Sequence, residues 1–559
     1  MKNNIIVKGI ATLLVAAGIT SCSEDYLQTY PVTSVDASTL MTQEGAEAAM
    51  NGLCRSMYTQ YQSLEDYHSV NGESWMSMFY GEVFGEDYFS LLWASRMASN
   101  YMWVSVTNYQ GWVCGMGWRY YYNLIGQANT LIESITASPE SESDIMKALK
   151  AEAYTIRAHA YIKLMQIYGP RWTDSDNGNR KCIVKRTQPG NDEVPLATCN
   201  EIYSLIYEDL DTAIALYEES ATKRTYMWEP NIDVARGLYA RAAMLKNDYP
   251  TAEKMAHDAR QNYPIMSSDE FVAGFAEPNG EWMWCNAAQV EGIYYWAHGS
   301  WYACQGPYPT LWGLGAGCIN YDLYKKIPQG DIRASQFFTP DKPLRRPITR
   351  ASFWNKDIVN PADMNLAKNA NMNISVSAFG KKLVPNGDEQ KWGLPYVARE
   401  EGGEGDIRIC FGAQYKFWAL DTYGTNAFPY MRGSEMLLTE AEAAYHNGHP
   451  GVTTACLQEL NANRNPNYSC NLSGDALLEE VRTQRRIELW GEGHSWFDFK
   501  RWSYTMDRRP WIAGDVNSNN IPQQYSLKKE PQEANGWRFA VPQSEIQYNH
   551  AINRAELDY

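Results

Sequence analysis

The sequence is short of basic residues: 49 Lys and Arg stand against 65 Asp and Glu over 559 residues, which gives a formal charge of −16. A protein that neutralises a phosphate backbone needs clustered Lys and Arg, so this deficit argues against a nucleic-acid-binding protein. The chain also lacks a glycine-rich phosphate loop and the HExxH and GxSxG motifs, which removes the local signatures of several enzyme classes. Apolar residues make up 45% of the sequence, and low-complexity segments are absent, as is typical of a folded globular protein.

No CxxC pair occurs among the 11 cysteines, so neither a zinc ribbon nor a thioredoxin motif is supported. We expect no metal and no cofactor, and we interpret most of the cysteines as small buried thiols. Apolar runs are short as well. After the first 21 residues, none reaches the length of a membrane-spanning helix.

The N-terminus has the pattern of a targeting segment. Two lysines precede the apolar stretch 10–19, which is too short for a spanning helix and ends in small residues before Cys22. This arrangement resembles the lipobox of bacterial lipoproteins, whose cysteine is diacylated and becomes the new N-terminus. We therefore predict a signal peptide over 1–21 and a lipid anchor on Cys22, since several acyl chains on one residue hold a protein at a membrane. The alternative is ordinary signal-peptidase cleavage nearby, with Cys22 incidental. The acidic residues 23–25 resemble the surface-export signal of Bacteroidetes lipoproteins.

Apolar and small residues recur at helical spacing over much of the chain. The predicted helices are 44–61, 118–135, 145–168, 201–217, 233–246, 251–263, 432–446, 452–462 and 475–490. The pair 233–246 and 251–263, joined by a short turn at Pro250, resembles a tetratricopeptide repeat, in which small residues let two antiparallel helices pack closely. The pair 432–446 and 452–462 has the same character.

Between residues 264 and 430 the chain is rich in Gly, Pro, Asn and aromatics, and its local patterns indicate short strands and loops, such as 281–284. Long irregular segments inserted in a rigid helical frame usually carry function. The sequence predicts a mostly α fold, in which a scaffold of tetratricopeptide-like helix pairs carries long irregular loops and small β elements. We expect one domain over 22–559, with a loop-rich ligand-binding region at about 264–430.

Aromatic residues are abundant, with 20 Trp and 38 Tyr. Half of the Trp fall in two windows, 71–122 and 281–312, mostly outside the predicted helices. Sugar rings pack their C–H faces on such side chains, while their hydroxyls need polar partners. We interpret Trp118, Trp282 and Trp284 as structural, because the first begins a helix and the other two alternate as in a strand. The predicted ligand contacts are Tyr88, Trp93, Arg96, Tyr101, Trp103, Trp296, Trp301 and Trp312.

Several segments together resemble the SusD/RagB family of surface glycan-binding lipoproteins from Bacteroidetes. The likeness runs through nearly the whole mature chain, and its motifs are specific only in combination. The segments are 24–27 (EDYL), 118–132 (WRYYYNLIGQANTLI), 150–161 (KAEAYTIRAHAY) with 168–170 (YGP), 485–502 (RRIELWGEGHSWFDFKRW) and 539–542 (FAVP). Ser495 stands where the family usually has a basic residue, which puts one local salt bridge in question.

The resemblance implies non-catalytic capture of an oligosaccharide and its delivery to a TonB-dependent outer-membrane transporter of the SusC type. It further implies a location on the outer membrane, lipid-anchored and facing the extracellular side. Three alternatives remain open: capture of peptides by a protein of the same family, a surface glycosidase, and a helical scaffold without a small ligand.

Glu492, His494 and Asp498 lie close together in sequence and suggest acid–base or metal chemistry at first sight. Arg485, Arg486, Lys500 and Arg501 surround them in sequence. We therefore predict a structural network of ion pairs and hydrogen bonds. A glycosidase needs two carboxylates at a set separation across a cleft, and no local motif indicates such a pair.

Overall fold

The computed structural model describes residues 37–58, 72–89, 98–286, 317–337, 383–385, 397–400, 406–408, 412, 414, 416–418, 426–510, 512, 515, 517–521 and 523–557. Over these residues the fold is mostly α with small antiparallel sheets, as predicted. The helices are α2 (Ala37–Leu40), α3 (Gln43–Tyr58), α4 (Glu73–Met78), the π-helical turn η2 (Phe79–Val83), α6 (Ala98–Tyr101), α7 (Trp112–Ala137), α8 (Asp144–Tyr168), η3 (Trp172–Asp174), α9 (Cys199–Ser220), α10 (Ile232–Leu245), α11 (Tyr249–Ala259), α12 (Ser268–Phe271), α15 (Tyr321–Tyr324), η4 (Ile332–Gln336), α17 (Gly433–His446), α18 (Pro450–Ala462), α19 (Asp475–Glu488), α20 (Ser495–Arg501), η5 (Gln523–Tyr525), α21 (Glu533–Trp537), α22 (Gln543–Tyr548) and η6 (Arg554–Glu556). The strands are β1 (Tyr88–Phe89), β2 (Lys181–Val184), β3 (Leu196–Thr198), β4 (Trp282–Cys285), β5 (Cys318–Ile319), β6 (Leu383–Pro385), β7 (Val397–Glu400), β8 (Asp406–Arg408), β9 (Pro429–Arg432), β10 (Met506–Arg508) and β11 (Leu527–Lys529).

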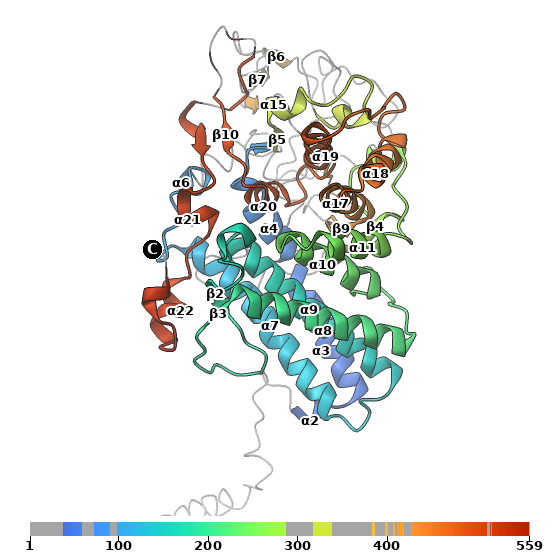
Figure 1. The fold of residues 1–559 in the computed structure, drawn as a ribbon, viewed down its shortest axis with the longest axis vertical. Helices are drawn as coiled ribbons and strands as arrows, with labels where there is room; N and C mark the ends of the chain where they lie inside the picture. The colour runs from blue at the N-terminus through green and yellow to red at the C-terminus, as the bar shows by residue number, and fades with distance from the viewer. Residues whose placement is uncertain are drawn as a thin grey trace, which may run out of the picture.

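The helical scaffold is one continuous stack. Along it, α7 packs on α8, α8 on α9, α9 on α10, α10 on α11, α11 on α17 and α17 on α18 (Figure 1). The two predicted helix pairs are α10–α11 and α17–α18, and they are neighbours in space although a long insertion separates them in sequence. A helical-repeat solenoid stacks helix pairs in such an order, each repeat against the next.

Local sequence signals explain where the long helices begin and end. The Ser143 hydroxyl accepts a hydrogen bond from the Met146 amide at the start of α8, and Thr198 and Glu201 form a capping box at the start of α9. α8 ends at Tyr168, because Gly169 and Pro170 follow it. Between the two helices Arg157 forms a buried ion pair with Asp209, with a nitrogen–oxygen distance of 2.9 Å from Nε. The pair links α8 to α9, the second and third helices of the stack.

The insertion between α11 and α17 contains short elements, as predicted. The strand expected at 281–284 is β4, which pairs with β9 beside the first turn of α17. Eight cysteines lie in the described ranges, all as free thiols, and seven of these are buried. None of the helices in those ranges is both long and apolar enough to cross a bilayer.

Candidate functional site

The predicted ligand contacts that the structure describes in the first aromatic window are core rather than surface. Trp103 is only 4% exposed, its Nε1 donates to the Phe84 carbonyl at 2.9 Å, and its ring meets that of Trp537 edge to face at 4.9 Å. Trp496 of the signature helix α20 packs on it from another side. The expectation that Trp103 is an exposed stacking surface is therefore wrong, because aromatic residues near the C-terminus cover the turn that follows α6.

Tyr88 and Tyr101 are buried as well, at 2% and 0% exposure. Tyr101 donates from its hydroxyl to the Tyr88 carbonyl at 2.8 Å, and the Tyr88 ring lies 5.5 Å from that of Trp490. Neither presents a free ring face to solvent, so their position does not support a stacking role. Trp118, Trp282 and Trp284 are buried, which confirms their interpretation as structural. The other predicted contacts lie outside the described residues: Trp93, Arg96, Trp296, Trp301 and Trp312.

The structure joins a strand inside the first window to the strand that follows the second window. β1, which leads into the segment 90–97, pairs antiparallel with β5, which follows the segment 287–316, so that Tyr88 is opposite Ile319 and Phe89 opposite Cys318. Next to this sheet, Asn320 donates from its backbone amide to the Asp87 carbonyl and from Nδ2 to the Glu86 carbonyl, both at 2.9 Å. A Cβ on Gly317 would lie 1.9 Å from the Tyr88 ring, so only glycine allows this approach. The chain thus holds the flanks of both windows side by side.

Residues of the C-terminal signature bind Glu86 and Asp87, which directly precede β1 in the first window. Arg486 on α19 forms ion pairs with Asp87 at 2.5 Å and with Glu86 at 2.8 Å, and Trp490 Nε1 donates to the Asp87 carbonyl. Ser495, at the position where a basic residue was expected, donates its hydroxyl to Asp87 at 3.2 Å. At position 495 a hydrogen bond from the Ser495 hydroxyl to Asp87 therefore stands in place of a salt bridge. The positive charge that pairs with Asp87 comes from Arg486 instead.

A second buried network of ion pairs holds Glu281, the first residue of the second window. Arg432 of β9 pairs with Glu281, which precedes β4, at 2.7 Å, and also with Glu488 and Glu492 at 3.0 and 2.7 Å. Lys416 forms a further ion pair with Glu492 at 2.6 Å. Burial by itself would raise the pKa of Glu488, but Arg464, Arg432 and Arg333 hold it well below its ordinary value. These carboxylates are committed to arginines and are not free for proton transfer.

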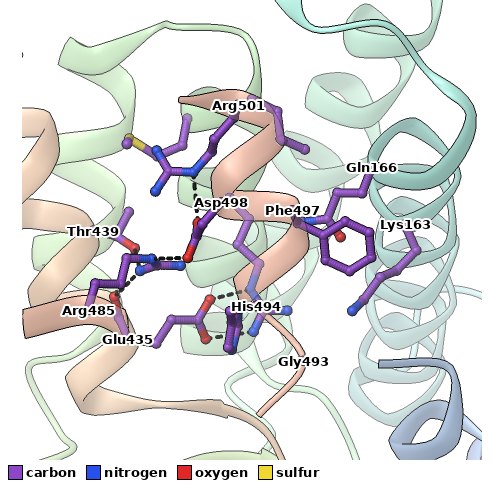
Figure 2. A pocket seen from close by; sticks show the side chains of 13 residues that line it. Lys163, Gln166, Glu435, Thr439, Arg485, Gly493, His494, Phe497, Asp498 and Arg501 are labelled. Carbon is purple, nitrogen blue, oxygen red and sulfur yellow. Dashed lines mark hydrogen bonds and ion pairs between the residues drawn. The ribbon is translucent and has the colours of Figure 1, made fainter. Parts of the chain in front are cut away.

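Asp498 lines a small cavity between α8, α10, α17 and α20 (Figure 2). Its two carboxylate oxygens pair with Arg485 at 2.7 Å and with Arg501 at 2.8 Å. Burial and the positive charges of Arg485 and Arg241 lower the pKa of His494 well below its ordinary value, so this ring is neutral near pH 7. The cavity holds about 30 Å³, which is room for water but not for a sugar.

The predicted ion network around the signature is confirmed for Asp498 but differs for the other members. Glu492 pairs with Lys416 and Arg432 rather than with its sequence neighbours. Lys500 donates to the carbonyls of Gln166 and Gly169 instead. No cluster of three or more His, Cys, Asp or Glu side chains within the described ranges is placed to hold a metal ion.

Comparison with known proteins agrees with this architecture. A family model described as "SusD family" matches residues 419–557, and a second model, "Starch-binding associating with outer membrane", matches residues 36–244. A SusD-like protein of Bacteroides ovatus is 22% identical over 526 residues, which cover 90% of this chain and 83% of the relative.

Solved structures share the fold. A SusD-like carbohydrate binding protein from Bacteroides vulgatus has a TM-score of 0.67 at 19% identity, with 93% of this chain and 98% of that one covered. Another, from Bacteroides fragilis, has a TM-score of 0.61 at 18% identity, with 92% and 100% covered. The two family models match the helical frame and the C-terminal signature, which are the parts that support the joined windows. The chain belongs to the SusD/RagB family.

Proposed function

We propose that this protein binds an oligosaccharide at the cell surface without cleaving it and passes it to a partner TonB-dependent outer-membrane transporter. The observation that carries the proposal is the pairing of β1 with β5, which brings the flanks of two Trp-rich segments together. Relatives that share the fold are named as carbohydrate binding proteins, and one matching family model is described as starch-binding and associating with the outer membrane.

The proposed contacts are the aromatic residues Trp93, Trp296, Trp301 and Trp312, with Arg96 as a polar partner. Indole faces stack on the apolar faces of sugar rings, whereas charged and amide groups bind the hydroxyls. Tyr88, Tyr101 and Trp103 have a supporting role in this proposal, because they are buried and flank in sequence the segment that carries Trp93 and Arg96.

The anchor in this proposal is a lipid on Cys22, which holds the protein on the outside of the outer membrane. The scaffold of paired helices then contacts the transporter, and the aromatic segments face the ligand. A cross-link between scaffold residues and a co-purified transporter supports this arrangement, and cross-links confined to the aromatic segments contradict it.

Binding without cleavage is tested on one panel of polysaccharides and peptides. Affinity electrophoresis in gels that contain each polysaccharide measures binding, and release of reducing ends measures hydrolysis. We expect retardation by at least one polysaccharide and no reducing ends. Retention of peptides alone supports the peptide-binding alternative, and release of reducing ends by the purified protein overturns the non-catalytic assignment.

A further inference from the structure

A second cavity, which contains none of the signature residues, lies at the ends of helices of the scaffold. It has a volume of about 780 Å³, within the roughly 300–1,000 Å³ range of small-molecule sites. Its walls come from α3, the start of α8, the end of α9 and the connection 221–231 that leads into α10, with α3, α8 and α9 lying side by side (Figure 1). We call this cavity the scaffold cleft.

Glu152 of α8 lines the scaffold cleft and is the reason to regard it as a site. The residue is 8% exposed, and its Oε2 is buried without a hydrogen-bond partner. A buried polar atom without a partner destabilises the folded state, so such a group calls for an explanation. Burial, together with the negative charge of Glu229, raises the pKa of Glu152 well above its ordinary value. A raised pKa favours the protonated carboxyl group, which can both donate and accept a hydrogen bond.

The charged residues that line the cleft indicate which class of ligand it can bind. The lining contains the acidic residues Glu47, Glu152, Glu229 and Asp233 but only two cationic ones, Lys223 and Arg224. Arg224 already donates to the carbonyls of Met283 and Glu229. An anionic ligand therefore finds little positive charge there. The described residues provide no group of three carboxylates or other metal-ligating side chains close enough to hold a cation. A neutral ligand rich in hydroxyl groups fits what remains.

Aromatic and amide groups complete the cleft in the manner of a sugar site. Tyr263 lines it, and its hydroxyl accepts a hydrogen bond from Asn231 at 3.0 Å. Tyr217 also lines the cleft and donates from its hydroxyl to the Pro230 carbonyl at 3.0 Å.

The wall of the cleft is tied to the second aromatic window. Arg224 donates to the Met283 carbonyl at 2.6 Å, and Trp284 Nε1 donates to the Trp228 carbonyl at 2.8 Å. Both partners belong to β4, which leads into the segment 287–316. The connection 221–231 is thus held in place from the same strand that leads into the second window.

We infer that the scaffold cleft is a second saccharide-binding site, in which Glu152 binds a sugar hydroxyl and the Asn side chains at the cleft bind others. The inference rests on the proposed function in one respect, that the ligand is a neutral carbohydrate. It adds a location and a set of residues that are separate from the two aromatic windows.

The test uses the full-length mature protein and a fixed panel of neutral oligosaccharides built from glucose, xylose, mannose, galactose or arabinose. Glu152→Leu removes the buried carboxyl group, and Asn51→Trp obstructs the cleft from an exposed position on α3. Glu218→Leu is the matched control, because Glu218 lies on the exposed face of α9. We expect both cleft variants to weaken binding of at least one saccharide about tenfold, while the control binds like wild type.

Thermal melting separates a binding role from a structural one. Glu152→Leu removes a buried unpartnered polar atom, so its melting temperature stays equal to that of wild type or rises. Loss of affinity together with an unchanged or higher melting temperature supports the inference. Unchanged affinity in both cleft variants overturns it and leaves the proposed function standing. Binding of lysine-containing peptides in the cleft instead of saccharides also overturns it. If wild type binds no saccharide, both proposals fail.

Discussion

Asn320 donates a hydrogen bond from Nδ2 to the backbone carbonyl of Glu86 at 2.9 Å, across 234 residues of sequence. The same residue caps α15 by accepting from the Asp322 amide at 2.8 Å. One buried side chain therefore links the end of the second aromatic window to the base of the first. This link, together with the β1–β5 pair, holds residues 86–89 of the first window against residues 318–320, which follow the second.

Asn320→Ala should loosen the junction. The change leaves the buried Glu86 carbonyl and the Asp322 amide without partners, at a cost of about 1–3 kcal/mol. We expect faster hydrogen exchange at Tyr88 and Ile319, together with weaker saccharide binding. Asn553→Ala is the control, because Asn553 caps η6 near the C-terminus. Equal exchange rates at β1 and β5 in wild type and Asn320→Ala would show that the junction does not depend on this side chain.

Trp103→Ala should destabilise the fold by about 3–5 kcal/mol, because the ring is buried against Trp496 and Trp537. Chemical denaturation measures the loss. Any effect on binding should follow the folded fraction, since this ring has no free face. An unchanged free energy of unfolding with a large loss of affinity would restore Trp103 to the binding site.

Asp498→Ala should cost about 3–5 kcal/mol of stability, because it leaves buried Arg485 without an acidic partner and removes one of the two carboxylates that pair with Arg501, the other being Glu442. Saccharide affinity per folded molecule should stay the same. Glu479→Ala is the matched control: its pair with Arg482 is exposed, and its loss should cost less than about 1 kcal/mol. A loss of affinity without a loss of stability would assign the signature to ligand binding.

Glu82→Gln should change how stability depends on pH. Burial, with a further contribution from Asp87, raises the pKa of Glu82 to about 8, even though the amides of Gly493 and His494 donate to it. Between about pH 5 and 8 the folded state then binds a proton that the unfolded state has lost, so Glu82 lowers stability as pH rises. The variant lacks this titration. It should gain stability relative to wild type over that range, by a few kcal/mol at most.

Melting curves across that pH range, with Glu479→Gln as an exposed control, measure the difference. A constant difference in melting temperature between Glu82→Gln and wild type from pH 5 to 8 would mean that Glu82 titrates normally.

Cys22→Ala should release the protein from the membrane fraction, because the acyl chains are its proposed anchor. Cell fractionation with detection of the protein measures the change. Retention of the variant in the outer membrane would rule out anchoring through this cysteine.

The scaffold was predictable because its signals are local. α8 and α9 begin within two residues of the predicted starts, since caps such as Ser143 and breakers such as Gly169 act on adjacent residues. The signature helix α20 was missed: it has seven residues and is buried on nearly all sides, so it shows no amphipathic pattern.

The candidate site was less predictable because distant residues decide it. Tyr88 and Trp103 lie in a segment whose aromatic content suggests exposed stacking surfaces. In the fold, however, Trp490 covers Tyr88, and Trp496 and Trp537 cover Trp103, all three from the C-terminal part of the chain. β1 and β5 have two residues each, too few for any periodicity to mark them or to indicate that they pair.

The central claim is that both aromatic windows contribute to one saccharide-binding surface. Calorimetric titration of Trp93→Ala and Trp301→Ala, one from each window, with a saccharide that wild type binds tests it most directly. Loss of one stacking platform costs about 1–3 kcal/mol, by analogy with base stacking on aromatic side chains, which is roughly ten- to hundredfold in affinity. We predict such a loss in each variant with an unchanged melting temperature. Wild-type affinity in both variants would contradict the claim.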